Sequence, residues 1–230
     1  LKDTSAGYDY EIDNTYNNIG FFLQHNWTFP KYLETVIGVR VDKHSEMSKP
    51  IFSPRVAIKL APHKKLNLRL SYAGGFRAPQ VFDEDLHIAV VGGDAQIITN
   101  HPDLKAETAH NLSLQVEVVK LLKRPWKLRL TAGGFATFLQ DAYALDMTDD
   151  PTTSDITEFT RINQGSARVL GGEVEATLNY KKRWDISTGW TFEKAAYGEG
   201  DPDFDETAFF RTPNVYGYVL TSLRPVGGLE

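Results

Sequence analysis

The chain has 230 residues, of which 41% are hydrophobic and 24% charged, a composition typical of a folded domain rather than of a disordered segment. Its formal net charge of −5 argues against a nucleic-acid partner, because phosphate binding depends on basic residues. The absence of cysteine excludes disulfides, thiolate metal sites and cysteine nucleophiles.

The sequence contains no run of about eighteen apolar residues, so no membrane-spanning helix is expected. No basic segment followed by an apolar one opens the chain, as a signal peptide would. We interpret 1–228 as an excised piece of a larger protein and Leu229–Glu230 as an expression scar.

Alternation of apolar and polar residues predicts strands along most of the chain, because side chains of a strand point to opposite faces in turn. Between Leu66 and Tyr72, leucines alternate with Asn67, Arg69 and Ser71. The predicted strands cover 16–29, 33–43, 51–61, 65–77, 107–121, 126–142, 157–180, 184–197 and 209–223. In the strand 157–180, Gly165 and Gly171–Gly172 are interpreted as bulges.

The connections between these strands alternate in length and in charge. Short connections carry basic residues and long ones carry acidic residues. The basic residues are Lys31, Lys64, Lys65, Lys123, Arg124 and Lys181 to Arg183; the acidic ones include Asp83, Glu84, Asp85, Asp146, Asp149, Asp201, Asp203 and Glu206. This layout is typical of an outer-membrane barrel with short periplasmic turns and long extracellular loops.

Aromatic residues recur close to the short connections and predict an interfacial girdle. They are Trp27, Phe29, Trp126, Tyr180 and Trp184. The alternative is that aromatic residues cap the end of any antiparallel sheet. Arg40, Arg69 and Arg129 fall on the polar faces of their strands, which avoids a cost of about 2–4 kcal/mol for a base facing the middle of the lipid.

Candidate ligand-binding residues gather in the long central connection. Asp83, Glu84, Asp85 and His87 offer oxygen and imidazole ligands for a cation, although their spacing is not that of a calcium loop and a solvated acidic loop is the simpler interpretation. His101 is the fifth candidate; with His87 and His110 it suggests a metal or haem contact, whereas spacings such as HxxxH are absent and surface histidines are the simpler interpretation.

Two further groups have competing interpretations. Arg77, in the segment Gly74 to Pro79, either contacts substrate or belongs to a structural motif in which the glycines bend the strand. Glu173 and Glu175 form either a glycosidase pair or part of a hydrated lumen, which is the simpler reading. No phosphate loop and no nucleophile elbow occur. We therefore predict no catalytic residue, no metal site and no cofactor.

Several motifs in this order resemble the TonB-dependent outer-membrane receptors over about residues 16–223. They are Gly38-Val39-Arg40-Val41-Asp42, Phe52-Ser53-Pro54-Arg55, Leu68-Arg69-Leu70-Ser71-Tyr72, Gly75-Phe76-Arg77-Ala78-Pro79, Pro102-Asp103-Leu104-Lys105-Ala106-Glu107, Asn163-Gln164-Gly165, Gly171-Gly172-Glu173-Val174-Glu175 and Arg211-Thr212-Pro213. Ala106 stands where the family usually has proline. The resemblance implies structural roles for residues of the fourth and fifth motifs, namely Gly75, Phe76, Arg77, Ala78, Pro79, Pro102, Leu104, Lys105 and Glu107.

The resemblance implies an outer-membrane barrel of twenty-two strands, closed by a plug, which imports a scarce nutrient such as a ferric siderophore, haem or cobalamin with energy from TonB. This chain offers no plug, no energy-coupling segment and fewer than half of those strands. The expected fold is therefore all-β: an antiparallel up-and-down meander of about nine long strands, forming part of a transmembrane barrel. The expected partners are outer-membrane lipid, a small nutrient ligand and, through absent parts, the TonB complex.

Two alternatives come from other classes. A soluble all-β sandwich that recognises carbohydrate or protein would use the same alternation but cover its apolar face with a second sheet. The second alternative is an outer-membrane enzyme, but the sequence shows no group of residues arranged for catalysis. An isolated barrel segment has two open edges and an uncovered apolar face, so we expect it to self-associate.

Overall fold

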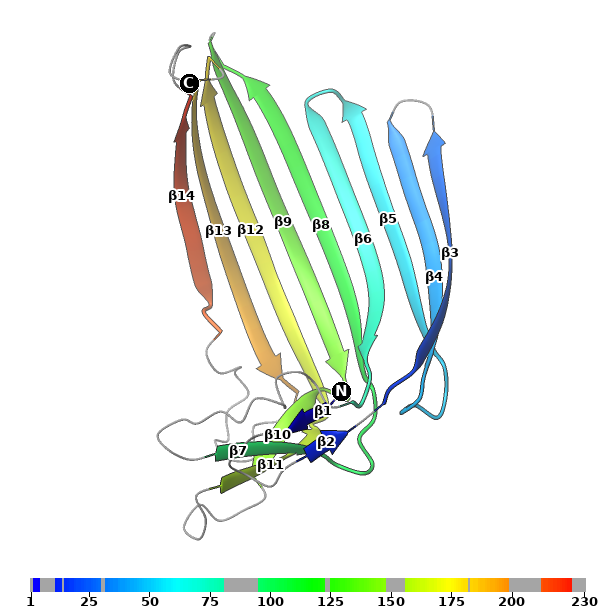
Figure 1. Cartoon of the computed structure of the whole chain (residues 1–230). Coiled ribbons are helices and arrows are strands. Elements are labelled where there is room, and N and C mark those ends of the chain that lie inside the picture. The colour runs from blue at the N-terminus through cyan, green and yellow to red at the C-terminus, as the bar shows by residue number, and fades with distance from the viewer. Residues whose placement is uncertain are drawn as a thin grey trace.

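The computed structural model describes residues 2–4, 11–13, 15–29, 32–80, 95–122, 125–147, 156–181, 183–198 and 212–224. Nine antiparallel strands form its main sheet in the order β14-β13-β12-β9-β8-β6-β5-β4-β3 (Figure 1). They are β3 (Asn18–Phe29), β4 (Leu33–His44), β5 (Ile51–His63), β6 (Leu66–Arg77), β8 (Glu107–Leu121), β9 (Trp126–Gln140), β12 (Ser166–Tyr180), β13 (Trp184–Tyr197) and β14 (Val215–Leu223). The predicted all-β meander of nine long strands is confirmed.

Two small sheets lie beyond one edge of the main sheet (Figure 1). One pairs β1 (Lys2–Thr4) with β2 (Glu11–Asp13). The other has the order β10-β11-β7, in which β11 (Ile156–Asn163) pairs antiparallel with β10 (Tyr143–Met147) and parallel with β7 (Ala95–Asn100). The strands β1, β2, β7 and β10 are not among those predicted from the sequence.

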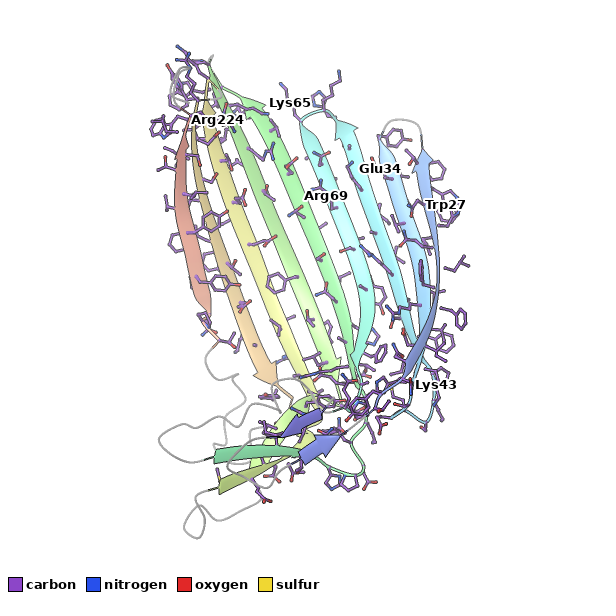
Figure 2. The ribbon with its side chains drawn as sticks, in the orientation of Figure 1. Trp27, Glu34, Lys43, Lys65, Arg69 and Arg224 are labelled. Atoms are coloured by element: carbon purple, nitrogen blue, oxygen red, sulfur yellow. The ribbon has the colours of Figure 1, made fainter. Side chains whose placement is uncertain are left out.

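The main sheet has two different edges. The connections β3–β4, β5–β6, β8–β9 and β12–β13 are short and lie at what we call the short-turn edge. The other four connections lie at the long-loop edge, next to the small sheets (Figure 1). Figure 2 shows Lys65 and Arg224 at the short-turn edge and Lys43 near the long-loop edge. The predicted alternation of short and long connections is therefore confirmed.

The predicted single strand 157–180 is wrong, because the structure has two strands there, β11 and β12. Gly165 between them has a φ of 58°, which is left-handed backbone that breaks a strand and favours glycine. The amide of Ala142 donates to the Gly165 carbonyl at 3.0 Å and holds the turn. Gly171 and Gly172 form no bulge, since both keep regular register with β9 and β13.

Other strand ends also differ from the expected ranges. β9 stops at Gln140 because the next residue, Asp141, has a φ of 52°. β14 begins at Val215 rather than at 209, and residues 209–211 lie outside the described part of the chain. The assignment of 1–228 to one barrel portion stays a prediction.

Cross-strand register divides the main sheet into two faces. Arg69 pairs with Gln115 and Ser71 with Ser113 on what we call the inner face, whereas Leu70 pairs with Leu114 on the outer face. The outer face carries no aspartate or glutamate on any of the nine described strands. Arg40, Arg69 and Arg129 all lie on the inner face, as predicted from the alternation.

The main sheet is a single layer without a conventional core. Among the described residues, the buried apolar side chains are Met47, Ala78, Ala142, Ala167, Ala195 and Ala196, and each lies near the long-loop edge. Outer-face side chains such as Phe21 (77% exposed) and Val219 (72%) have no second sheet over them within the described chain. The sandwich alternative is therefore wrong.

The five predicted girdle residues share the outer face at the short-turn edge. Trp126 pairs with Tyr180 and Tyr180 with Trp184 across three neighbouring strands. Phe29 pairs with Leu33 on the same face, between β3 and β4 at the other end of the strand order. The rings of Trp126 and Tyr180 lie 4.6 Å apart between centroids. None of the described segments forms a helix with the length and apolar character that a membrane crossing requires.

Candidate functional site

Polar side chains of neighbouring strands form connected rows on the inner face. Lys59 donates to Glu34 at 2.9 Å, and Arg69 donates to Gln115 at 3.0 Å. Ser71 and Ser113 share a hydrogen bond of 2.7 Å. These pairs are exposed or half-buried, so each contributes about 0–1 kcal/mol to stability. Their main effect is to fix the positions of the polar side-chain atoms on the inner face.

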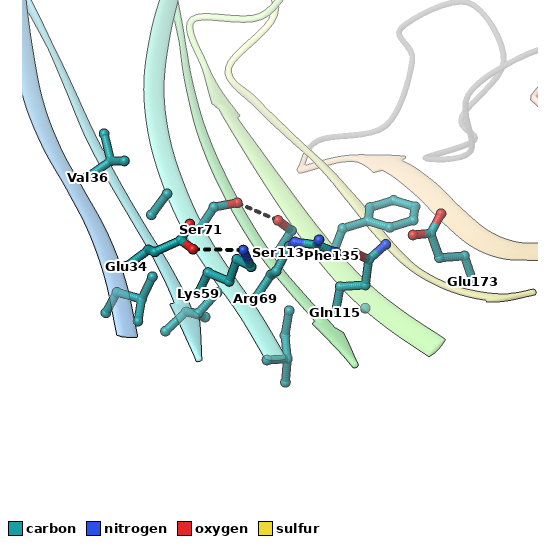
Figure 3. Close-up of a pocket in the computed structure, with 14 residues that line it drawn as sticks. Glu34, Val36, Lys59, Arg69, Ser71, Ser113, Gln115, Phe135 and Glu173 are labelled. Carbon is teal, nitrogen blue, oxygen red and sulfur yellow. Dashed lines mark hydrogen bonds and ion pairs between the residues drawn. The ribbon is translucent and has the colours of Figure 1, made fainter. Parts of the chain in front are cut away.

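A shallow groove of about 290 Å³ crosses these rows on the inner face (Figure 3). Figure 3 shows Arg69, Ser71, Ser113 and Gln115 together on one side of the curved strands, with the carboxylate of Glu173 at the other end of the groove. The groove thus offers a guanidinium, hydroxyl groups and a carboxylate within one surface. Such a surface suits a polar ligand or a polar protein segment.

The charges of the inner face are segregated by strand. On β5 and β6 the inner-face charges are all basic, namely Arg55, Lys59, Arg69 and Arg77. On β12 and β13 they are all acidic, namely Glu173, Glu175, Asp185 and Glu193. Between them, Glu117 on β8 lies 3.7 Å from Arg129 on β9. The inner face therefore has a basic strip and an acidic strip.

Aromatic rings lie over glycines in the acidic strip. A Cβ added to Gly189 would lie 2.5 Å from the ring of Tyr218, so the ring occupies the space that glycine leaves. The hydroxyl of Tyr218 donates to Glu175 at 3.1 Å. Phe135 covers Gly171 in the same way, with its Cζ 2.3 Å from an added Cβ. Glycine at these positions allows aromatic side chains to line the inner face.

A buried carboxylate closes the long-loop end of β4. Asp42 is fully buried and accepts hydrogen bonds from Arg40 Nε and Nη2 at 2.7 Å each and from Asn18 Nδ2 at 3.1 Å. Gly20 leaves room for it, since an added Cβ would lie 2.6 Å from Asp42 Oδ1. The pair Arg40–Asp42 is therefore structural, because its carboxylate is shielded from solvent.

The motifs of the sequence meet at the long-loop edge in what we call the loop-base cluster, formed by Arg77, Lys105, Glu107, Tyr143 and Asn163. The hydroxyl of Tyr143 donates to the Arg77 carbonyl at 3.0 Å, and the Tyr143 amide donates to Glu107 Oε2 at 2.9 Å. The Arg77 guanidinium lies 5.6 Å from the centroid of the Tyr143 ring. Tyr143 thus joins the end of β6 to the start of β8.

Asn163 completes the cluster from the end of β11. Its Oδ1 accepts from the Lys105 amide at 2.8 Å, and its Nδ2 donates to the carbonyls of Lys105 at 3.1 Å and Asp141 at 2.7 Å. The described contacts of Arg77, Glu107 and Asn163 therefore hold the connections at their bases. This geometry favours the structural interpretation of Arg77 over substrate contact.

The position of Tyr143 perturbs its acid–base behaviour. Burial raises the pKa of Tyr143 to about 12, because the phenolate would lose water, and the nearby charge of Glu107 acts in the same direction. The amide of Glu107, which donates to the hydroxyl oxygen, and the charges of Arg77 and Arg161 partly oppose this shift. The hydroxyl is consequently neutral and able to donate at physiological pH.

The predicted ligand-binding residues are mostly not testable in this structure. Asp83, Glu84, Asp85 and His87 lie outside the described residues. His101 is described, and its Nδ1 accepts the Asp103 amide at 3.1 Å while its own amide donates to the Arg161 carbonyl at 3.0 Å. These contacts give His101 a role in the turn that precedes β8. Its role in ligand binding stays a prediction.

The other histidine candidate and the two carboxylate candidates lie on opposite faces of the main sheet. His110 lies on the outer face of β8, where its Nδ1 shares a hydrogen bond of 2.8 Å with the Tyr72 hydroxyl. Glu173 and Glu175 lie on the inner face of β12, as expected of a lumen surface. Over the described ranges, no cluster of three or more histidine, aspartate or glutamate residues is arranged to hold a metal ion.

Tyr143 is the residue that sequence reasoning missed. It follows a predicted strand by one residue and precedes a predicted polar loop, and no motif includes it, so no local pattern distinguishes it. Its importance comes from contacts with Arg77 and Glu107, which are distant in sequence. The Gly–aromatic pairs were missed for the same reason.

Comparison of the sequence with known families matches residues 2–229 to the family described as TonB dependent receptor-like, beta-barrel. The sequence matches none of the curated proteins with which it was compared.

Solved structures share the fold at low sequence identity. The siderophore receptor PirA from Pseudomonas aeruginosa is 18% identical, with a TM-score of 0.62 over 79% of this chain and 35% of that one. A G324V mutant of the ferric enterobactin receptor PfeA from the same organism is 16% identical, with a TM-score of 0.67 over 96% and 32%. The copper transporter OprC is 14% identical, with a TM-score of 0.65 over 98% and 36%. The chain thus spans about a third of the length of these proteins, and the likeness shows the fold alone.

Proposed function

Because the chain belongs to the TonB-dependent receptor β-barrel family, whose members are outer-membrane transporters and not enzymes, we propose that it forms part of the wall of a nutrient importer. The observation that carries the proposal is the division of the nine-stranded sheet into a polar, charged inner face and an outer face without acidic residues. A transmembrane barrel needs this division, because one face meets lipid and the other meets the lumen.

Within that function, we propose that the complete receptor imports a ferric siderophore with energy from the TonB complex. The basic strip on β5 and β6 supports an anionic metal chelate, because Arg55, Lys59 and Arg69 present positive charge to the lumen. Haem and cobalamin are the other nutrients that the family implies.

The test is uptake by cells that carry or lack the full-length gene. Cells grown under iron limitation are supplied with radiolabelled ferric siderophores, haem or cobalamin, with and without a functional TonB complex. We expect the gene to be required for uptake of one ferric siderophore, and only when TonB is active. Unchanged siderophore uptake in the deletion strain, together with lost uptake of haem or cobalamin, would replace the proposed substrate.

A matched pair of variants tests the inner face. Arg69→Gln removes a base from the basic strip, whereas Lys120→Gln removes a base from the outer face near the short-turn edge. We expect R69Q to weaken siderophore uptake severalfold and K120Q to leave it unchanged. Equal siderophore uptake by both variants would contradict a role of the basic strip in uptake.

A further inference from the structure

Four cationic residues interrupt the otherwise uncharged outer face of the main sheet. By register they are Lys43, Lys120, Arg168 and Lys194. Lys43 donates to the Met47 carbonyl, and Lys120 lies near the short-turn edge. Arg168 and Lys194, in contrast, lie next to each other on neighbouring strands near the long-loop edge.

Arg168 pairs with Ala196 and Lys194 pairs with Leu170, so the two cations are diagonal neighbours. Side chains of this length reach each other across that diagonal. Both are exposed, and within the described chain neither takes part in an ion pair. Two adjacent like charges on an apolar face are unfavourable unless an anion lies between them.

The strand geometry places these cations at the level of lipid headgroups. Arg168 lies twelve residues along β12 from Tyr180, a member of the aromatic girdle. At about 3.3 Å per residue and a tilt of about 35–45°, this is about 28–32 Å along the membrane normal. Lys194 lies ten residues from Trp184 on β13, about 23–27 Å by the same reasoning. The apolar band of such a barrel is about 25 Å tall, so both cations meet its outer boundary.

The two cations line a cavity whose wall is partly polar and partly apolar. It measures about 510 Å³ and includes Gln140 and Ser166 beside Arg168 and Lys194. Guanidinium, ammonium, amide and hydroxyl groups all donate hydrogen bonds, and no carboxylate lines the cavity. This donor set matches a phosphate group.

A lane of small side chains runs from the cavity toward the middle of the outer face. On β9 it consists of Ala136, Gly134 and Ala132, with Gly172 beside Gly134 on β12. Larger side chains flank it, including Leu114 on β8 and Phe192 on β13. At its lower end, a second groove of about 320 Å³ has an almost wholly apolar lining that includes Val116, Leu130 and Trp190. The lane therefore continues the cation site with a surface for a hydrocarbon chain.

From this arrangement, we infer that the outer face of β9, β12 and β13 binds a phosphorylated lipid of the outer leaflet. Arg168 and Lys194 hold the phosphate, and one acyl chain lies in the lane over Gly134. The inference uses the membrane orientation of the family and does not depend on which nutrient is imported.

The test measures lipid binding to the full-length receptor by native mass spectrometry in detergent. The probes are phosphatidic acid, diacylglycerol with the same acyl chains, and inorganic phosphate. We expect phosphatidic acid to remain bound at least tenfold more than diacylglycerol, and inorganic phosphate not to displace it. Equal binding of phosphatidic acid and diacylglycerol would overturn the inference. Complete displacement of phosphatidic acid by inorganic phosphate would contradict the proposal that the bound anion belongs to a lipid.

Variants locate the site on this face. Arg168→Gln with Lys194→Gln is expected to lower retention of phosphatidic acid at least tenfold, and Lys120→Gln, which removes a cation from the same face near the opposite edge, is expected to have no effect. Gly134→Leu fills the lane, and its Cβ meets only an ordinary contact of 3.7 Å with the Gly171 carbonyl oxygen, so the backbone leaves room for a side chain at this position. We expect G134L to weaken lipid binding even if the double variant fails to fold. Unchanged retention in G134L or in a folded double variant would contradict the proposed site.

Discussion

Tyr143 shows how a single residue organises the long-loop edge. Its amide and hydroxyl contact Glu107 and Arg77, which lie in two separate motifs of the sequence. The ring also receives the Arg77 guanidinium at 5.6 Å. A residue outside every motif therefore connects the motifs.

We expect Tyr143→Phe to lower stability by about 1 kcal/mol at neutral pH, because it removes the hydrogen bond to the Arg77 carbonyl but keeps the ring. The measurement is thermal unfolding of the full-length receptor in detergent. Tyr32→Phe, at an exposed tyrosine near the short-turn edge, is the control and should change little.

The difference in stability between the unsubstituted receptor and Y143F should depend on pH. The folded state raises the pKa of Tyr143 to about 12 from an unfolded value of about 10. The folded state therefore binds this proton more tightly, so the stabilisation is fully present below pH 10 and is lost as the pH rises toward 12. A difference that stayed constant from pH 8 to pH 12 would contradict the assigned role of the hydroxyl.

At the scale of strands, glycine and aromatic residues act as pairs across the sheet. Phe135 covers Gly171 and Tyr218 covers Gly189 on the inner face, while Trp190 covers Gly217 on the outer face at 2.7 Å from an added Cβ. Each glycine thus provides the space for one ring. The strand interior tolerates these glycines because a neighbouring ring replaces the missing side chain.

Gly171→Ala should destabilise the receptor by about 1–3 kcal/mol, since the new methyl group forces the Phe135 ring out of its position. Gly134→Ala is the matched control, because its added methyl group meets only an ordinary contact. In a double-mutant cycle with Phe135→Ala, the effect of G171A should largely disappear. Additive effects in that cycle would show that the two residues do not interact.

Alternation predicted the long strands because each has one apolar and one polar face. The pattern marked Gly165 only as a bulge within one strand, because 156–163 and 166–180 are both extended and alternation does not reveal the positive φ that separates them. It also could not predict β7 and β10, because β7 pairs in parallel with a strand about 60 residues away and both are short. The candidate residues Asp83, Glu84, Asp85 and His87 stay predictions.

At the scale of the whole molecule, the nine-stranded sheet is open. β3 and β14 are its edges, and within the described residues each pairs on one side only. Every outer-face side chain of β3 is exposed, including Leu23 at 75%. An open edge offers unpaired backbone groups, and an uncovered apolar face offers a surface that avoids water.

We therefore expect the isolated 230-residue chain to self-associate in solution without detergent. Light scattering over a range of protein concentrations should show a mass that grows with concentration. Detergent should reverse association through the apolar face, whereas pairing through the edges should persist. A monomer at every concentration in the absence of detergent would sink this expectation.

The central claim is that the inner face of this sheet meets water and the outer face meets lipid. Because the 230 residues contain no cysteine, single cysteines can be placed along β8 in a full-length receptor whose other cysteines are replaced. Spin labels at Leu112, Ser113, Leu114, Gln115 and Val116 in liposomes then report collisions with oxygen, which concentrates in lipid, and with a water-soluble nickel complex. The account predicts strict alternation, with positions 112, 114 and 116 reached by oxygen and positions 113 and 115 by nickel. Equal access of both reagents along the strand, or the opposite alternation, would contradict it.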